Sequence, residues 1–234
     1  MKAIKIFGLA AALILLVSGC KKSDYYLDGG TQNGTFNGSV MQFLESKPEL
    51  FRQLAGVVRY AGLEQALSSE QVTFFAPADS SIRKTIEFAN IMLPLFGKPA
   101  ISEITDIKPA IWRKYLARYI FKGSKSLSDY AQLDPGNLSA YSGQMFSSYD
   151  GEPMNIGVVF TDANGVKYAG YRYLMISYVN SSTPRDYTTW RVAVVASSNI
   201  KADNGYIHAL RFADFEFEFG FSAIGFVEDI IYNN

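Results

Sequence analysis

The sequence contains very little of the two residue types that most often build reactive sites. Among 234 residues there is one cysteine, Cys20, and one histidine, His208. A single thiol excludes an internal disulfide, and a lone histidine without clustered carboxylates does not match the usual metal-ligand sets. Gly-rich phosphate loops, a Gly-x-Ser-x-Gly elbow and zinc-ligand spacings are also missing from the sequence. The sequence therefore predicts no metal, no cofactor and no enzymatic activity.

The chain also has no excess of charge of either sign. Lys and Arg together number 22, and so do Asp and Glu. If an N-terminal segment holding Lys2 and Lys5 is removed, the net charge becomes −2. A balanced chain lacks the electrostatic attraction for nucleic acid or anionic lipid, so no nucleic-acid partner is expected. A hydrophobic content of 48% and an aromatic content of 15% are ample for one packed domain.

The first twenty residues have the pattern of a secretory signal. After the two lysines comes an apolar run over residues 6–17, which is too short for a membrane span of roughly 20 residues. The next residues, Val17-Ser18-Gly19-Cys20, resemble the lipobox of bacterial lipoproteins, which implies a diacylglycerol and an N-acyl chain on Cys20. We therefore expect residues 1–19 to be removed and the acyl chains to hold the protein on a membrane.

A polar segment follows the cysteine. It is rich in Gly, Asn and Asp and cannot bury a core, so residues 20–37 are predicted to be a flexible tether and residues 38–234 a single domain. Lys21-Lys22 differs from the aspartate that retains some lipoproteins at the inner membrane. We therefore expect the outer membrane, with the domain displayed at the cell surface and the periplasmic face as the alternative.

The first half of the domain is predicted to be helical. Apolar residues recur at helical spacing from Pro48 to Gly62, from Asp79 to Pro94, and from Pro109 to Ile120. Asp79 or Ser80 is expected to cap the second helix. Between the first two helices, the β-branched and aromatic run Val72–Ala76 predicts a strand that ends at Pro77.

The second half is predicted to consist of strands. The runs are Met154–Phe160, Lys167–Val179 and Thr188–Ala196, and Asp162–Gly165 has the chemistry of a hairpin turn. A last strand is indicated by four alternating phenylalanines (Phe215, Phe217, Phe219 and Phe221), whose face is either core or interface, with Glu216 and Glu218 on the solvated face. Helices followed by strands predict an α+β domain dominated by an antiparallel sheet.

Two stretches resemble the motifs of the fasciclin (FAS1) domain family. Val72–Ile82 is similar to the first motif, in which a strand ends in Phe-Ala-Pro before a helix, and Ile200–Leu210 is similar to the second, an Asn-Gly turn followed by Ile-His. The resemblance covers roughly residues 38–215. It implies a fasciclin-like fold, in which an antiparallel sheet forms a wedge or sandwich and several helices pack at one end, and it implies a role in adhesion.

The motif residues are interpreted as structural. They are Thr73, Phe75, Ala76, Pro77, Asn204, Gly205, Ile207 and His208. Pro77 ends the strand, and Asn204-Gly205 is expected to supply a positive-φ hairpin turn. His208 is interpreted as a partly buried histidine whose hydrogen bonds are satisfied, with a catalytic or ligand role as the less favoured alternative.

The sequence departs from the family in two ways. Animal members often carry a Tyr-His pair after the middle helix, proposed as a receptor contact, whereas Leu116–Phe121 contains no histidine. Receptor binding of the animal type is therefore not expected. The strand region 162–198 is longer than the family needs, and residues 216–234 extend beyond its usual end. Such additions are where a partner-specific surface is expected.

Aromatic side chains crowd the longer region. They are Tyr168, Tyr171, Tyr173, Tyr178, Tyr187 and Trp190. Two interpretations remain open: packed strand residues that belong to the core, or an exposed surface that binds a glycan or a protein.

The leading hypothesis from the sequence is a non-catalytic, lipid-anchored binding protein of the cell envelope that acts in adhesion or surface assembly. Its expected partners are the membrane, through the acyl chains on Cys20, and either an outer-membrane protein or an extracellular protein or glycan. The alternative is an accessory lipoprotein subunit of a TonB-dependent outer-membrane importer for a glycan or peptide.

Overall fold

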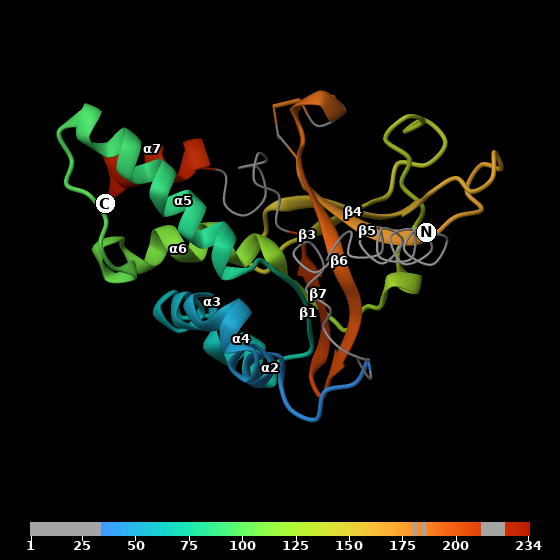
Figure 1. Cartoon of the computed structure of the whole chain (residues 1–234), viewed down its shortest axis with the longest axis horizontal. Coiled ribbons are helices and arrows are strands. Elements are labelled where there is room, and N and C mark those ends of the chain that lie inside the picture. The colour runs from blue at the N-terminus through green and yellow to red at the C-terminus, as the bar shows by residue number, and fades with distance from the viewer. Residues whose placement is uncertain (1–33, 180–181, 184–185, 212–222) are drawn as a thin grey trace, which may run out of the picture. The chain divides into compact units, whose positions relative to one another are not determined.

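A computed structural model describes residues 34–179, 182–183, 186–211 and 223–234, and residues 34–234 form one unit (Figure 1). Cys20, the signal segment, most of the expected tether and the expected strand at residues 215–221 lie outside the described residues. No helix in the described ranges is long and apolar enough to cross a membrane.

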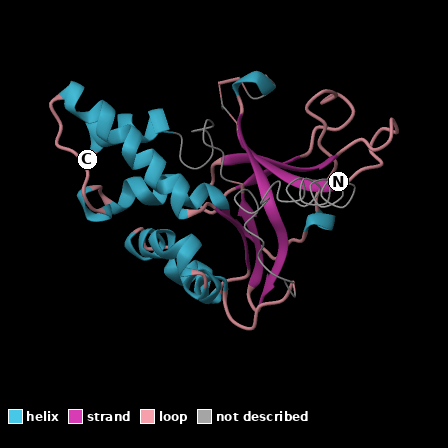
Figure 2. Ribbon diagram, viewed as in Figure 1, coloured by secondary structure: helices cyan, strands magenta, loops and turns pink. Residues whose placement is uncertain are grey.

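The N-terminal half of the unit is mostly helical, as the apolar spacing predicts. Its helices are α2 (Val40–Ser46), α3 (Pro48–Tyr60), α4 (Glu64–Ser69), α5 (Asp79–Met92) and α6 (Pro109–Leu116), with α7 (Ala223–Asn233) at the C-terminus. Short 3₁₀ turns are η1 (Leu93–Phe96), η2 (Ile104–Asp106), η3 (Ala117–Tyr119), η4 (Leu127–Asp129) and η5 (Tyr187–Thr189). The α-helices gather on one side of the sheet (Figure 2).

Within the described residues, seven strands form one continuous sheet in the order β2-β1-β7-β6-β5-β4-β3. They are β1 (Val72–Ala76), β2 (Ile120–Lys122), β3 (Gln144–Ser147), β4 (Pro153–Phe160), β5 (Arg172–Tyr178), β6 (Arg191–Ala202) and β7 (Gly205–Leu210). Every neighbouring pair is antiparallel except β1 and β7, which run parallel. The predicted α+β fold with a mainly antiparallel sheet is confirmed.

Strand β6 belongs to both halves of the sheet. Its N-terminal part pairs with β5, from Tyr178↔Arg191 to Met175↔Val194, and its C-terminal part pairs with β7. The register with β7 shifts twice between Val195 and Ile200, which is the signature of β-bulges that bend a strand. The bend separates a half built from β2, β1 and β7 from a half built from β3, β4 and β5.

Strand β1 lies at the centre of the core. All five of its residues are buried, because its two faces meet different layers. Phe74 has no exposed surface and belongs to the same apolar cluster as α2, α3 and α4, whereas the ring of Phe75 contacts the rings of Phe121 and His208. A strand that is covered on both faces is mostly apolar along its length, as Val72–Ala76 is, with Thr73 as its one polar residue.

Four expectations about local structure need correction. Helix α6 ends at Leu116, and Ile120 begins β2 instead of extending the helix. The N-cap of α5 is Ala78, without a side-chain hydrogen bond. The carboxylate of Asp79 instead accepts the backbone N–H groups of Gln53 and Leu54 at 2.9 and 2.8 Å and so fastens α5 to α3.

The other two corrections concern strand bounds. Strand β5 begins at Arg172, not at Lys167, because Tyr168 has a φ of 62°, which no strand residue adopts. Strand β6 begins at Arg191, after the 3₁₀ turn η5, and continues to Ala202. At the N-terminal boundary, residues 34–37 lie along β6, where Phe36 N–H donates to Lys201 O at 2.7 Å.

Candidate binding surfaces

The six aromatic residues of the longer strand region do not form one surface. Strand pleating places Tyr173 on one face of β5 and Tyr178 on the other, and Tyr171, directly before β5, lies with its ring beside that of Tyr173. Tyr187 and Trp190 come from η5 and its C-terminal end, and Tyr168 comes from the β4–β5 loop. The structure therefore divides the predicted surface into three separate places.

Four of these side chains form a cluster on the face of β5 that points away from the core. The rings of Tyr171 and Tyr173 lie 5.9 Å apart, and those of Tyr187 and Trp190 lie 5.1 Å apart. The Tyr187 hydroxyl contacts Met175 Sδ, which lies on the same face of β5 as Tyr173, at 3.5 Å. We call Tyr171, Tyr173, Tyr187 and Trp190 the outer aromatic surface.

The outer aromatic surface is partly exposed and partly buried. Tyr171 is 73% exposed, while the other three side chains are half-buried. Burial raises the pKa of Tyr173 and of Tyr187, so both hydroxyls are neutral at physiological pH. Trp190 Nε1 is buried and donates no hydrogen bond within the described part of the chain. Rings with neutral polar edges suit a partner that combines apolar and hydrogen-bonding groups.

Tyr168 is held in the β4–β5 loop by two aspartates. Its hydroxyl donates to Asp134 Oδ2 at 2.8 Å, and its backbone N–H donates to Asp162 Oδ1 at 2.9 Å. The hydrogen bond to Asp134 is the main reason why the pKa of Tyr168 rises to about 12, and the same bond lowers the pKa of Asp134. Asn164 and Gly165 adopt positive φ values of 51° and 79° at the expected Asn-Gly turn. The polar groups here satisfy one another.

Tyr178 faces the other side of the sheet, toward the helices. The guanidinium carbon of Arg118 lies 4.2 Å from the centroid of its ring and 4.8 Å from that of Tyr115. Sequence reasoning singled out Tyr178 but not the arginine, although Arg118 stands in the stretch that follows the middle helix.

His208 is a neutral core residue in the structure. Its side chain has no exposed surface. Nδ1 accepts the Asn199 N–H at 3.2 Å, so Nε2 carries the proton and donates to Lys125 O at 3.1 Å. Burial lowers the pKa of His208 to about 4, against a smaller raising effect of the bond to Lys125. A fully engaged, uncharged imidazole offers no nitrogen to a substrate or a metal ion.

Asn204 joins the strands to the helices. Its side-chain oxygen accepts the Val40 N–H at 2.8 Å, and its amide nitrogen donates to the carbonyls of Leu67 and Glu70 at 3.2 and 2.8 Å. The next residue, Gly205, lies so close to β1 that an added Cβ would stand 1.7 Å from the carbonyl oxygen of Val72. The expected left-handed turn at Asn204-Gly205 needs correction, because Asn204 has no positive φ and Gly205 has a φ of 157°. Close approach to β1 is therefore what requires glycine.

The remaining motif residues build the contact between β1, β2 and β7. Thr73 Oγ1 donates to Gly123 O at 2.7 Å and accepts the Lys125 N–H at 2.9 Å. Phe74 pairs with Ile207, and Ala76 is the last residue of β1, directly before Pro77. These positions support the fold and present no reactive group.

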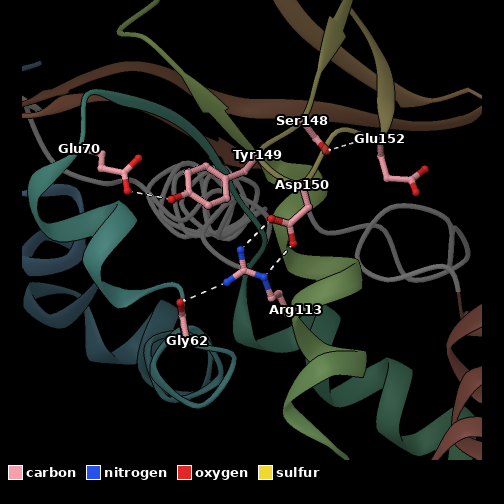
Figure 3. A network of polar contacts seen from close by, with 7 residues as sticks. All are labelled: Gly62, Glu70, Arg113, Ser148, Tyr149, Asp150 and Glu152. Carbon is pink, nitrogen blue, oxygen red and sulfur yellow. Dashed lines mark hydrogen bonds and ion pairs between the residues drawn. The ribbon is translucent and has the colours of Figure 1, made fainter.

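A polar network that the sequence did not reveal fastens the β3–β4 turn to the helices. Arg113 on α6 donates from Nε and Nη2 to the two oxygens of Asp150 at 2.8 and 2.7 Å, and from Nη1 to Gly62 O at 3.3 Å (Figure 3). The Tyr149 hydroxyl donates to Glu70 Oε1 at 2.8 Å. The bond to Asp150 raises the pKa of Arg113, and the bond to Glu70 raises that of Tyr149. This network serves as a clamp, because its charged groups engage one another.

Outside residues 1–33, 180–181, 184–185 and 212–222, no three His, Cys, Asp or Glu side chains are placed together so that they could hold a metal ion. The outer aromatic surface is therefore the main candidate for binding a partner.

Comparison with known proteins identifies one family. A family model described as "Fasciclin domain" matches residues 49–211. Among solved structures 14 chains match. One of them is a FAS1 domain pair from the insect cell adhesion molecule Fasciclin I, with 16% identity and a TM-score of 0.48 over 76% of this chain and 51% of that chain. The present chain thus spans about half the length of that structure. No curated protein matches the sequence.

Proposed function

The chain belongs to the fasciclin domain family, and from this premise we propose that it is a non-catalytic binding protein of the cell envelope. In this proposal the protein acts in adhesion or surface assembly. The family match covers residues 49–211, more than half of the chain, and the only histidine is buried, neutral and fully hydrogen-bonded. Both observations support binding over catalysis.

The observation that carries the proposal is the outer aromatic surface. Tyr171 stands 73% exposed beside the ring of Tyr173, on the longer strand region that the sequence marked as an addition. Aromatic rings bury a large area at a low cost in conformational entropy, and Tyr and Trp are enriched at binding interfaces for this reason. The same rings can stack on the apolar faces of sugars. A surface glycan or an extracellular protein is therefore the proposed partner.

Binding at this surface can be tested with a matched tyrosine. Tyr171→Ala removes an exposed ring of the outer aromatic surface, and Tyr232→Ala removes a ring that is 75% exposed on α7. We expect Tyr171→Ala to weaken attachment of the protein to glycan or matrix arrays by about tenfold, as removal of an interface aromatic commonly does. Equal binding of the wild type and both variants would contradict the proposed surface.

Membrane attachment forms a separate part of the proposal. We propose that Cys20 carries acyl chains and that they hold the protein in the outer membrane, with the domain at the cell surface. Wild-type protein should incorporate a labelled fatty acid and sediment with membranes, whereas Cys20→Ser should do neither. Protease added to intact cells should digest the wild-type domain if it faces outward. A Cys20→Ser protein that is labelled and sediments with membranes like the wild type would show that another residue carries the anchor and would contradict this part of the proposal.

A second candidate function is an accessory subunit of a TonB-dependent importer of a glycan or peptide. The observation that favours it is the same exposed aromatic cluster on an added segment, which could contact a channel instead of a matrix. Purification of the tagged protein from membranes in mild detergent separates the two functions. A β-barrel that copurifies in constant ratio would favour the importer, and a protein that elutes alone would favour adhesion.

A further inference from the structure

Arg118 is a buried cation. It lies in η3, directly after α6, and only 9% of its surface is exposed. Its guanidinium carbon is 4.8 Å from the ring centroid of Tyr115 on α6 and 4.2 Å from that of Tyr178 on β5. Two aromatic rings from different elements therefore surround a permanent positive charge.

No acceptor within the described ranges neutralises this charge. The structure contains no ion pair or hydrogen bond from the guanidinium to another described residue, and Nε is buried without any partner. Asp229, which also contacts Tyr115, is engaged by the Tyr115 hydroxyl at 2.7 Å and by Lys114 Nζ at 2.6 Å. Arg118 thus differs from Arg113 on α6, five residues earlier, whose guanidinium holds both oxygens of Asp150.

Aromatic rings supply only part of what a buried guanidinium needs. Ring faces attract the cation, but they accept none of its five N–H groups in the way that a carboxylate does. A buried N–H without a hydrogen-bonding partner, such as the Nε–H of Arg118, is unfavourable and calls for a reason. An incoming anion would provide the missing acceptors.

We propose that Arg118 is an anion-binding site that takes a carboxylate, sulfate or phosphate group of a ligand on the in-plane edge of its guanidinium. The planar fork of arginine matches such groups bidentately, and its nearby rings fix its orientation. The site lies on the helix-facing side of β5, whereas the outer aromatic surface lies on the opposite face. It therefore goes beyond the proposed adhesion function, and either one can fail without the other.

The first test uses the full chain in detergent micelles with simple anions as probes. Thermal unfolding is followed in sodium sulfate, sodium phosphate and sodium acetate, each compared with sodium chloride at equal ionic strength. We expect at least one of the three anions to raise Tm above the chloride value in the wild type. Sulfate and phosphate raise the Tm of folded proteins generally, so only the part of a rise that is absent from the Arg118 variant described next counts as binding. Such a difference in acetate alone assigns a carboxylate ligand, and one in sulfate and phosphate assigns a tetrahedral anion. Equal Tm values in all four salts would overturn the proposal.

Two variants locate the effect. Arg118→Met keeps most of the apolar stem of the side chain without the charge and should weaken binding of the responding anion by about tenfold or more, since charge-assisted hydrogen bonds are lost. Arg113→Met is the matched control and should bind the anion as the wild type does. An unchanged affinity in Arg118→Met, or an equal loss in Arg113→Met, would overturn the assignment.

A measurement on the wild type guards against a variant that fails to fold. The Nε–H resonance of Arg118, assigned in ¹⁵N-labelled protein, should shift as the anion is titrated and saturate with the same affinity as the change in Tm. An Arg118 resonance that stays fixed while Tm rises would place the anion elsewhere and overturn the proposal.

Discussion

The two halves of the sheet differ in how they treat buried polar groups. In the half formed by β1, β2 and β7, the side chains of Thr73, Asn204 and His208 are buried and hydrogen-bonded at every polar atom described above. In the half that contains β4 and β5, Ser177 Oγ and Asn155 Oδ1 are buried without a partner within the described residues. Trp190 Nε1, beside β6, is in the same situation.

Tyr130 Oη, whose ring contacts Phe75 and His208, is the exception in the first half, because it too is buried without a partner among the described residues. Apart from it, the first half is closed by its own contacts and the second is not. Buried polar groups are normally satisfied, so each exception calls for a reason. The closed half holds both family motifs and joins the helices to the strands. The open half holds the added region and the outer aromatic surface. We infer that the first half maintains the fold and that the second is free to vary with the partner.

The largest effect is expected from filling the closest contact of the closed half. Gly205→Ala puts a Cβ into the carbonyl of Val72, and because backbone must move, the free energy of unfolding should fall by more than about 4 kcal/mol. Gly165→Ala, in the β4–β5 loop, meets open space at a φ of 79° and should cost about 1 kcal/mol. Urea unfolding monitored by circular dichroism measures both. Equal losses of unfolding free energy in Gly205→Ala and Gly165→Ala would contradict the contrast between the two halves of the sheet.

Lowering the pH should reduce the free energy of unfolding, because His208 is buried and neutral in the half formed by β1, β2 and β7. The unfolded chain binds a proton to this residue near its ordinary pKa of 6.5, whereas the folded chain does so only near pH 4. Between these values the unfolded state holds the extra proton, so stability is lost as pH falls from about 6.5 to about 4. The loss should reach about 3 kcal/mol.

The matching variant isolates this effect, because His208 is the only histidine in the chain. In His208→Gln the free energy of unfolding should lose its steep dependence on pH between 6.5 and 4, leaving only the shallower change due to carboxylates. Denaturant midpoints at pH 7.5, 6, 5 and 4.5 provide the comparison. A variant that keeps the full wild-type slope would show that His208 does not cause it.

The smallest effect is expected from removing one buried hydroxyl in each half of the sheet. Thr73→Val removes a hydroxyl that makes two hydrogen bonds and leaves their partners unsatisfied, which should cost about 2 kcal/mol. Ser177→Ala removes a buried hydroxyl that has no partner among the described residues and should change stability by less than about 0.5 kcal/mol. Chemical denaturation of both variants is the measurement. A Ser177→Ala loss as large as that of Thr73→Val would remove the contrast.

Local sequence signals predicted most of the fold. Helix α3 begins at Pro48, β1 covers Val72–Ala76, and the Asn164-Gly165 turn has both expected positive φ values. Each signal depends on residues a few positions apart, whose geometry is set by backbone sterics and by side-chain periodicity. The alternation of side chains along a strand also predicts that Tyr178 and Tyr173 lie on opposite faces. The two were grouped together because the region is rich in aromatic residues, without regard to this alternation.

Long-range partners account for what the sequence did not predict. The Asp79 carboxylate leaves its own helix for N–H groups on α3 about 25 residues away, and Asn204 bonds groups more than 130 residues away. Arg113 meets Asp150 only after the β3–β4 turn docks on α6. A local sequence pattern cannot predict these partners, because a polar side chain bonds whichever groups the folded chain brings near it.

The parallel pairing of β1 with β7 has a consequence for the order in which the chain can fold. Residues 72–76 are made early during synthesis, yet their partners, residues 205–209, arrive more than a hundred residues later. Until then one edge of β1 is open and Asn204 cannot hold the helices. Such non-local closure slows folding and prolongs the exposure of apolar surface. A growing chain therefore cannot complete its sheet until residues 205–209 have been made.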